Sequence, residues 1–348
     1  MKKPASALKE RRQMNSNTVL LLITIVLFAI MYIAGMIAYS GKGFTTLQTL
    51  CNLFINNAAL ICVACGMTVV MLTGGIDISV GSLVALDCMF LCYGMANWGL
   101  SAPVAILLVL VIGVVFGLVQ GFLIGYLEIQ PFIVSMAGLF FARGMVSVIS
   151  TNQLSITADV NQAFYDFANA RITFPFGATI NRQGVAIYPY IRLSVVIAIV
   201  ALVAVFLILR YTKFGRGLYA VGGSEQSAAM MGLNVKATKM KAYITCSLLA
   251  SIGGICYCMN GLYASTTVAT GFEMDAIASS VIGGTLLTGG VGNVIGSFFG
   301  VLINGTINEL VQTDGRLASS WPNILTAALL CVFIVLQSIF AKIKEKSK

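Results

Sequence analysis

Long apolar segments are the feature of this sequence that most constrains its fold. They lie at about 18–40, 53–73, 80–98, 102–127, 131–150, 191–210, 242–264, 274–288, 293–311 and 322–341. A transmembrane helix needs about 20 apolar residues, and most of these segments reach that length. Only 9% of the residues are charged, whereas a soluble protein carries about 25%. The sequence therefore predicts an all-α, polytopic membrane protein of about ten transmembrane helices.

One membrane domain, predicted over 18–341, accounts for almost the whole chain. A basic N-terminus at 1–17 precedes it, and a basic tail at 342–348 follows it. A cleaved signal peptide has an apolar region of about 7–15 residues, so the longer first segment is expected to remain as a permanent span.

Charge asymmetry predicts the orientation of the chain. Fifteen of the 21 lysines and arginines lie before the first span, in the loop 211–241 with its flank, or in the tail. An even number of spans places these three regions on one side, which the positive-inside rule makes cytoplasmic. Loop 151–190 is then external. The net charge of +9 follows from this topology, so no nucleic-acid partner is expected.

Several classes of activity are excluded by missing residues. The chain has no histidine, which excludes histidine-based catalytic triads and histidine-ligated zinc. Cys62 and Cys65 form a C-x-x-C inside an apolar run, where packing is the expected role. The only Gly-Lys pair, at 41–42, lacks the Ser or Thr of a P-loop. We expect no catalytic residue, metal or cofactor, and no ATP hydrolysis by this chain alone.

A ten-residue pattern occurs twice. Residues 73–82 read TGGIDISVGS and residues 288–297 read TGGVGNVIGS, with five identical positions. Each copy separates two apolar segments, so each predicts a break between membrane helices, and the equal orientation of the copies indicates a parallel repeat. The alternative is a chance recurrence of Gly-rich turns in a chain with 35 glycines. The candidate helix-break residues are Gly74, Gly75, Ser79, Gly81, Gly289 and Gly290.

Three charged residues within the predicted spans or in the break between them are candidates for the translocation path. An acid near hydrocarbon is a functional candidate, although Asp77 could instead cap the following helix. Asp87 lies within the third span and is expected to face the bundle interior or a wet path. Arg143 could neutralise an acid, contact a substrate hydroxyl or reach the interface. The remaining polar groups in the spans are mostly amides and hydroxyls, which suits a neutral, hydroxylated solute better than an ion.

The loop 211–241 contains a predicted short helix at 222–232. Ser224 is placed to cap it, Glu225 lies in its first turn and Gly232 is placed to end it. Ala228, Met230 and Met231 give it an apolar contact surface. So short a helix is marginal alone in water. It therefore either lies on the membrane surface or docks with a cytoplasmic partner.

Three motifs together carry a resemblance to a known family. Residues 66–82 (GMTVVMLTGGIDISVGS), 220–224 (AVGGS) and 282–292 (IGGTLLTGGVG) resemble the permeases of ribose/galactose-type sugar ABC importers over nearly the whole chain. Within that family, residues 272–278 (FEMDAIA) and 314–321 (DGRLASSW) are most similar to a galactofuranose permease.

The resemblance implies a type II-like importer fold in a bacterial cytoplasmic (inner) membrane, surrounded by lipid. It implies three protein partners: an ABC ATPase subunit, a second permease subunit in a homo- or heterodimer, and an extracytoplasmic sugar-binding protein. It also makes the helix at 222–232 an ATPase-coupling element with Gly222, Gly223, Ser224, Glu225, Ala228, Ala229 and Gly232. Family members often carry Glu-Ala-Ala there, whereas this chain has Gln226-Ser-Ala.

The expected function is therefore that of a permease subunit, not an enzyme, that conducts a neutral pentose or hexose such as galactofuranose. An ion-coupled secondary sugar carrier is the alternative, with Asp77 and Asp87 as its only evident coupling groups. An intramembrane enzyme is disfavoured because histidine is missing and the acids are scattered.

Overall fold

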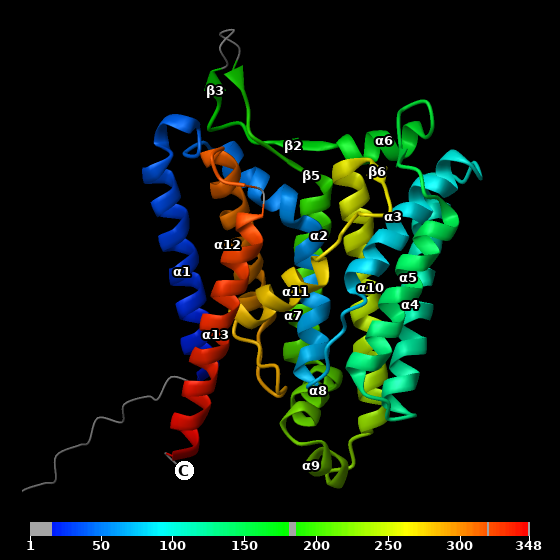
Figure 1. The fold of residues 1–348 in the computed structure, drawn as a ribbon, viewed down its shortest axis with the longest axis vertical. Coiled ribbons are helices and arrows are strands. Elements are labelled where there is room, and N and C mark those ends of the chain that lie inside the picture. Colours follow the sequence, from blue (N-terminus) through cyan, green and yellow to red (C-terminus); the bar gives the residue numbers. More distant parts are fainter. Residues whose placement is uncertain (1–15, 181–185, 319, 347–348) are drawn as a thin grey trace, which may run out of the picture.

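The computed structural model describes residues 16–180, 186–318 and 320–346. The basic N-terminal residues 1–15 and Arg182 lie outside this range. The described chain forms an elongated helical bundle (Figure 1). Its bundle helices are α1 (Ser16–Ala38), α2 (Leu47–Leu72), α3 (Val80–Ala96), α4 (Ala102–Gly125), α5 (Pro131–Ile149), α7 (Leu193–Tyr211), α10 (Val235–Gly261), α11 (Phe272–Ile282), α12 (Val294–Asp314) and α13 (Trp321–Lys346).

The remaining elements cover the two ends of the bundle. Helices α8 (Lys213–Gly223) and α9 (Glu225–Met230) lie at one end together with the end of α13 (Figure 1). At the opposite end are η1 (Ser40–Lys42), α6 (Gln162–Asn169) and the short strands β1 (Leu154–Ser155), β2 (Arg171–Thr173), β3 (Thr179–Ile180), β4 (Ala186–Ile187), β5 (Tyr190–Arg192) and β6 (Tyr263–Ala264). These pair antiparallel as β1–β6, β2–β5 and β3–β4.

The predicted all-α membrane fold is confirmed. In the described part of the chain, seven helices are long and apolar enough to cross a membrane. Helices α3 and α13 contribute shorter apolar stretches, and α11 has only 11 residues. The loop 211–241 and the end of α13 lie together, opposite most of segment 151–190, as the even span count requires (Figure 1).

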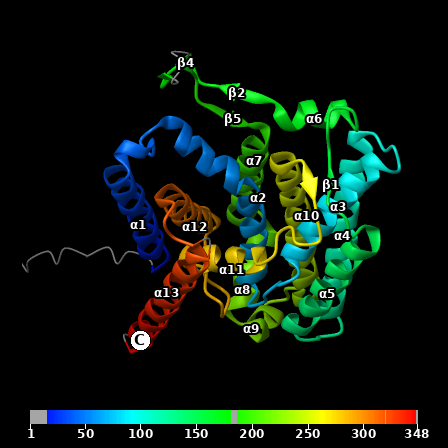
Figure 2. The ribbon, with the colours of Figure 1, turned by 45° about the horizontal axis from the view of Figure 1, so that its top comes forward.

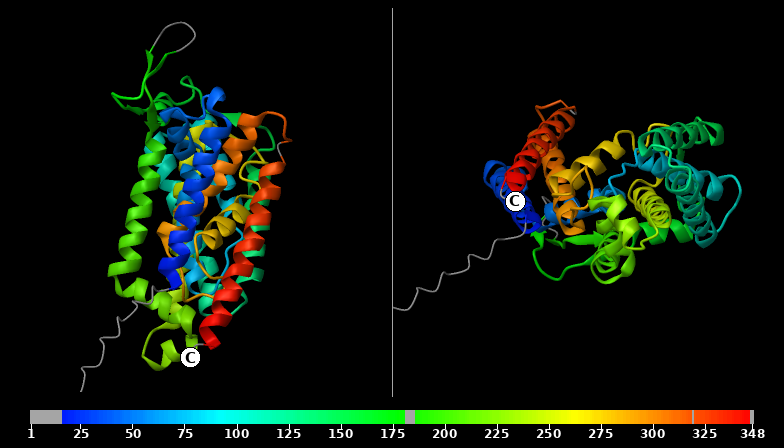
Figure 3. Two further views of the ribbon diagram at one scale, coloured as in Figure 1. Left: turned by 90° about the vertical axis from the view of Figure 1, so that its left-hand side faces the viewer. Right: turned by 90° about the horizontal axis from the view of Figure 1, so that it is seen from below.

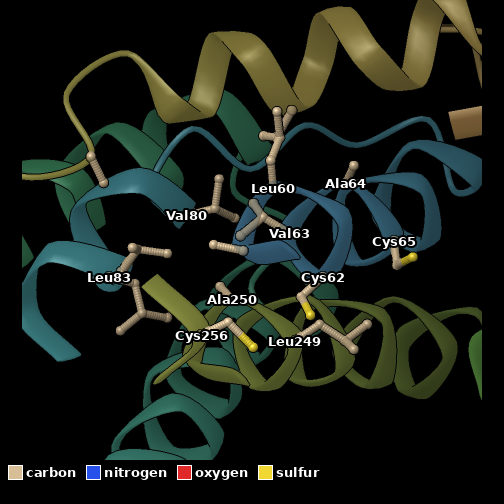
Figure 4. Close-up of a cluster of buried hydrophobic side chains, with 14 of the residues drawn as sticks. Leu60, Cys62, Val63, Ala64, Cys65, Val80, Leu83, Leu249, Ala250 and Cys256 are labelled. Atoms are coloured by element: carbon tan, nitrogen blue, oxygen red, sulfur yellow. The ribbon is translucent and has the colours of Figure 1, made fainter. Parts of the chain in front are cut away.

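Helices α2, α3 and α10 form the centre of the bundle. Their buried side chains are mostly small and apolar, and Cys62 and Cys256 point into one such cluster (Figure 4). The cysteines there are buried and free, so they pack as small hydrophobes.

Helix α4 packs on α10 through a stripe of glycines at every fourth position, Gly113, Gly117, Gly121 and Gly125. A Cβ at Gly117 would lie 2.7 Å from the α10 backbone at Ile244, and one at Gly121 would lie 2.7 Å from the Met240 carbonyl. Without side chains on this face, the two backbones can approach closely.

Two helix boundaries differ from those predicted. Helix α10 begins at Val235, not near 242, because Asn234 caps it by accepting the Ala237 N–H at 2.9 Å. Helix α11 ends at Ile282, whereas an apolar span to 288 was predicted. Gly283 there packs directly on Gly296 of α12, and Gly284 has a φ of +90°. The close contact and the left-handed residue end the helix, and 283–293 forms a loop.

Candidate functional site

The two copies of the repeated pattern meet at one end of the bundle. The first follows α2 and leads into α3, and the second follows α11 and leads into α12. A backbone hydrogen bond joins the second copy to the residue just before the first, in which the Gly290 N–H donates to the carbonyl of Leu72, the last residue of α2, at 3.0 Å. Gly74, Gly289 and Gly290 have φ values of +78°, +84° and +72°, a region that favours glycine. The two breaks therefore support each other through main-chain contact.

A third glycine pair joins them. Gly222 lies near the end of α8, and a Cβ there would overlap both the Leu72 carbonyl and the Gly290 amide. A Cβ on Gly289 would lie 2.9 Å from the Gly74 Cα and 3.1 Å from the Gly222 Cα. We call Gly74, Gly222, Gly289 and Gly290, with the Leu72 carbonyl, the glycine junction. Sequence analysis placed Gly74, Gly289 and Gly290 among the helix-break residues and Gly222 among the coupling residues. The Gly-Gly pair that all three segments contain was the signal that could have connected them.

Two candidate glycines lie beside the junction. Gly75 faces Tyr243 of α10, whose hydroxyl donates to the Ile76 carbonyl at 3.3 Å. At Gly223 a Cβ would meet nothing within 4 Å. Of this pair, only Gly222 therefore lacks room for a side chain.

Helix α9 follows the junction directly. It covers Glu225–Met230, and Ser224 caps it by accepting the Ser227 N–H at 3.2 Å. Gly232, with a φ of +81°, turns the chain beyond it. The predicted helix at 222–232 is therefore shorter, since Gly222 and Gly223 belong to α8. Ala228 is fully buried against its own chain, whereas Met230 and Met231 are 77% and 69% exposed. The apolar surface that α9 presents is formed by these two methionines and not by Ala228.

Two ion pairs tie this end of the molecule to α10. Lys239 pairs with Glu225 of α9 at 2.5 Å, and Lys236 pairs with Glu128 of the α4–α5 turn at 3.0 Å. A cavity of about 480 Å³ between the two pairs is also lined by Gln226 and Ala229. A hydrogen bond from Lys236, and then its charge, hold the pKa of Glu128 below its usual value. The two ion pairs therefore connect α9 to α10 and α10 to the α4–α5 turn.

Asp77 lies in the turn that leads into α3. Its Oδ1 accepts the backbone N–H of Ser79 at 2.9 Å and the Ser79 hydroxyl at 2.5 Å. The Gln120 amide donates to the same hydroxyl at 2.8 Å. Asp77 is fully buried, and its Oδ2 has no partner among the described residues. Asp77 therefore holds the turn just before α3, whose N-cap residue is Ser79, and none of its described hydrogen bonds comes from a backbone N–H within the helix.

Asp87 faces the protein interior. It is fully buried, with its Cβ 2.8 Å from the position that a Cβ on Gly254 of α10 would take. Neither carboxylate oxygen has a hydrogen-bond partner within the described residues. The bundle-facing orientation expected of this acid is present, but nothing in the described chain compensates a charge there.

Arg143 of α5 holds the irregular segment that leads into α11. Its guanidinium donates to the carbonyls of Val268 at 2.7 Å and Thr266 at 3.2 Å. Irregular backbone at membrane depth is tolerated only when it is buried in protein or lines a water-filled cavity. Figure 2 shows α11 and this segment between α12 and α3.

Sequence analysis did not single out the two acids of α11, Glu273 and Asp275, as site residues. Glu273 lies against Gly81 of α3, which explains why that position is glycine. The Asn304 side-chain Nδ2 donates to Asp275 Oδ1 at 3.1 Å, and the Thr326 hydroxyl donates to the Asn304 side-chain Oδ1 at 3.1 Å. The two acids in the first turn of a short apolar segment were the signal available. Asp77, Asp87 and Arg143 do not converge on one another through any described hydrogen bond or ion pair.

Comparison with known proteins identifies the fold. The family model described as the permease component of branched-chain amino acid transport systems matches residues 49–336. The chain belongs to this family of permeases. It is 39% identical over 318 residues to the inner membrane ABC transporter permease protein YjfF of Escherichia coli, covering 91% of each chain.

Other relatives are named as sugar importers. The fructose import permease protein FruG of Bifidobacterium longum is 37% identical, covering 97% of this chain and 94% of its own. The ribose import permease protein RbsC of Escherichia coli is 32% identical, covering 89% and 91%. No solved structure is significantly similar to the chain. The assignment as an ABC transporter permease agrees with the expectation of a transporter subunit that is not itself an enzyme.

Proposed function

We propose that this chain forms the translocation path of an ATP-driven importer for a neutral monosaccharide, and that α9 couples the path to a separate ABC ATPase. The glycine junction is the observation that carries this proposal. It joins both helix breaks to the segment immediately before α9 by backbone contact. Close-packed backbone atoms are nearly incompressible, so a displacement of α9 is expected to displace both helix breaks.

The chemistry of the interior supports a sugar as the substrate. Carboxylates, amides and hydroxyls gather near α11 and in the segment that Arg143 holds, and such groups hydrogen-bond sugar hydroxyls. The relatives named for fructose, ribose and galactose import favour a pentose or hexose. Residues 272–278 and 314–321 make galactofuranose the first sugar to test within that class.

The complex that this function requires has three further proteins. We propose an ABC ATPase at the α9 end, a second permease copy or homologue beside this chain in the membrane, and an extracytoplasmic sugar-binding protein at the α6 end. We place the complex in the bacterial inner membrane because the relative YjfF is named as an inner membrane protein. We place the α9 end on the cytoplasmic side because loop 211–241 and the tail carry many of the basic residues.

Uptake by proteoliposomes that contain the whole complex tests the proposal. Labelled galactofuranose, ribose, fructose and galactose are offered with the binding protein outside and ATP inside. We expect uptake of at least one sugar to require ATP and to persist without ion gradients. Uptake that follows an ion gradient and ignores ATP would instead support a secondary carrier using Asp77 or Asp87.

A further inference from the structure

A basic cavity lies at the α9 end of α7, apart from the glycine junction. Its volume is about 410 Å³. Its lining comprises Phe206, Leu209 and Arg210 of α7, Arg216 and Tyr219 of α8, and residues 292–294 at the start of α12. The Tyr219 hydroxyl donates to the Gly292 carbonyl at 3.0 Å and so closes one wall. The consecutive helices α7 and α8 and the distant start of α12 therefore build one concave site.

The two arginines of this cavity have no acidic partner. Neither forms an ion pair with a carboxylate of the described residues. Arg216 donates only a long hydrogen bond of 3.5 Å to the Tyr211 carbonyl, and the Arg210 guanidinium lies 5.8 Å from the Phe206 ring centroid. A planar guanidinium keeps several N–H donors in a fork that matches phosphate oxygens. The site is thus suited to an anion with several acceptor oxygens.

The position of the cavity identifies the kind of anion. Arg210 lies in the last turn of α7, a helix long and apolar enough to cross the membrane. Val200, Val203 and Leu207 are exposed and precede it at helical spacing, so an apolar stripe leads along α7 to the cavity. Figure 3 shows α7 on the outside of the bundle, on the opposite face from α13. The α7 surface thus combines a cavity suited to a phosphate group with an adjacent apolar stripe suited to acyl chains.

We propose that this cavity binds the headgroup of an anionic phospholipid, whose acyl chains lie along the exposed stripe of α7. Basic pockets between membrane helices on the cytoplasmic side are suited to such headgroups. A free phosphate would pair with the arginines but leave most of the cavity and the stripe unused. Bound there, the lipid contacts α7, α8 and the loop that continues from Gly290 to α12.

Thermal denaturation of the assembled transporter in neutral detergent tests the proposal. Short-chain phosphatidylglycerol, short-chain phosphatidylcholine and inorganic phosphate are titrated separately. We expect only phosphatidylglycerol to raise the melting temperature in a saturable way. Arg210→Gln and Arg216→Gln should each weaken its apparent affinity roughly tenfold, which corresponds to about 1.4 kcal/mol. Arg210→Lys keeps the charge without the fork and should weaken it less.

Lys241→Gln is the matched control, since it removes one exposed positive charge from the same end of the molecule. It should leave the affinity for phosphatidylglycerol unchanged. An equal loss in this variant would mean a general surface-charge effect and would overturn the proposal. Equal stabilisation by phosphatidylcholine or by inorganic phosphate would overturn the lipid assignment. So would arginine variants that keep the lipid response but no longer bind the ATPase, because the cavity would then receive protein.

Discussion

Asp77 combines a hydrogen-bonded turn before α3 with an oxygen that has no partner among the described residues, so substitutions can separate the turn contact from the charge. Asparagine can accept the same Ser79 N–H, whereas alanine cannot, and the lost hydrogen bond costs about 1 kcal/mol. We therefore expect Asp77→Asn to keep the melting temperature and sugar uptake near wild type, and Asp77→Ala to lower both. If Asp77→Asn folds normally but loses uptake as fully as Asp77→Ala, then the charge itself is needed for transport.

The Glu128–Lys236 pair should give a small pH dependence to stability. Lys236 lowers the pKa of Glu128 in the folded state from its ordinary value of 4.5. The stabilisation is therefore complete above that value and is lost as the pH falls through the lower, folded-state pKa. We expect any difference in melting temperature between wild type and Glu128→Gln to be present at pH 7 and to vanish in acid. A difference that grows below pH 4.5 would contradict this. Both side chains are largely exposed, so the effect is small.

The sequence could not show which way the apolar residues of α9 face, and Ala228 is the example. Its position in a capped helix identified it as part of an apolar surface, but not which way that surface faced. The structure buries Ala228 within the chain and exposes Met230 and Met231. We expect Met230→Asp with Met231→Asp to abolish capture of the ATPase by the tagged permease. Val160→Asp, an added charge in the external loop, is the control and should not affect capture; equal capture by both variants would exclude α9 as the docking element.

At the scale of elements, the α4 glycine stripe should be intolerant of bulk. Leucine at Gly117 would meet the α10 backbone at Ile244 and Tyr243, and such overpacking typically costs about 1–3 kcal/mol. Val115→Leu enlarges an exposed position of the same helix and serves as the control. We expect Gly117→Leu alone to lower the melting temperature or the yield of monodisperse protein. A wild-type melting temperature for Gly117→Leu would show that the helices are not so closely packed.

The sequence located most helices within a few residues because long apolar runs determine membrane spans. It failed where tertiary contact decides the structure. Leu286 and Leu287 extend an apolar run, yet the contact of Gly283 with Gly296 ends α11 before them. Likewise the four-residue spacing of glycines in α4 was visible, but only its partner α10 explains it. The repeated pattern was found in the sequence, while the meeting of its copies with Gly222 was not.

At the scale of the whole molecule, the orientation can be tested by labelling. Because we propose that the α9 end is cytoplasmic, we expect Met231→Cys to react with an impermeant thiol reagent only after cells are permeabilised. Val160→Cys, in the segment 151–190 that we expect to be external, should react in intact cells. Eight of the nine native cysteines are buried, and Cys331 is exposed, so the unmodified protein provides the background. Labelling of Met231→Cys in intact cells would reverse the proposed orientation.

The glycine junction brings both helix breaks into main-chain contact with the end of α8, which leads into the coupling helix that we propose. Gly222 and Gly223 allow this to be tested with a single methyl group. A Cβ at Gly222 overlaps the Leu72 carbonyl and the Gly290 amide, whereas one at Gly223 meets nothing within 4 Å. The two variants are thus adjacent and chemically identical, and they differ only in their contact with the junction.

The most direct measurement is sugar uptake per ATP hydrolysed, in proteoliposomes of the complete transporter, for Gly222→Ala against Gly223→Ala. We predict that Gly222→Ala still binds the ATPase and hydrolyses ATP but loses at least about tenfold of its uptake, a loss of roughly 1.4 kcal/mol in coupling. Gly223→Ala should transport as wild type does. Equal uptake per ATP by the two variants would contradict the account.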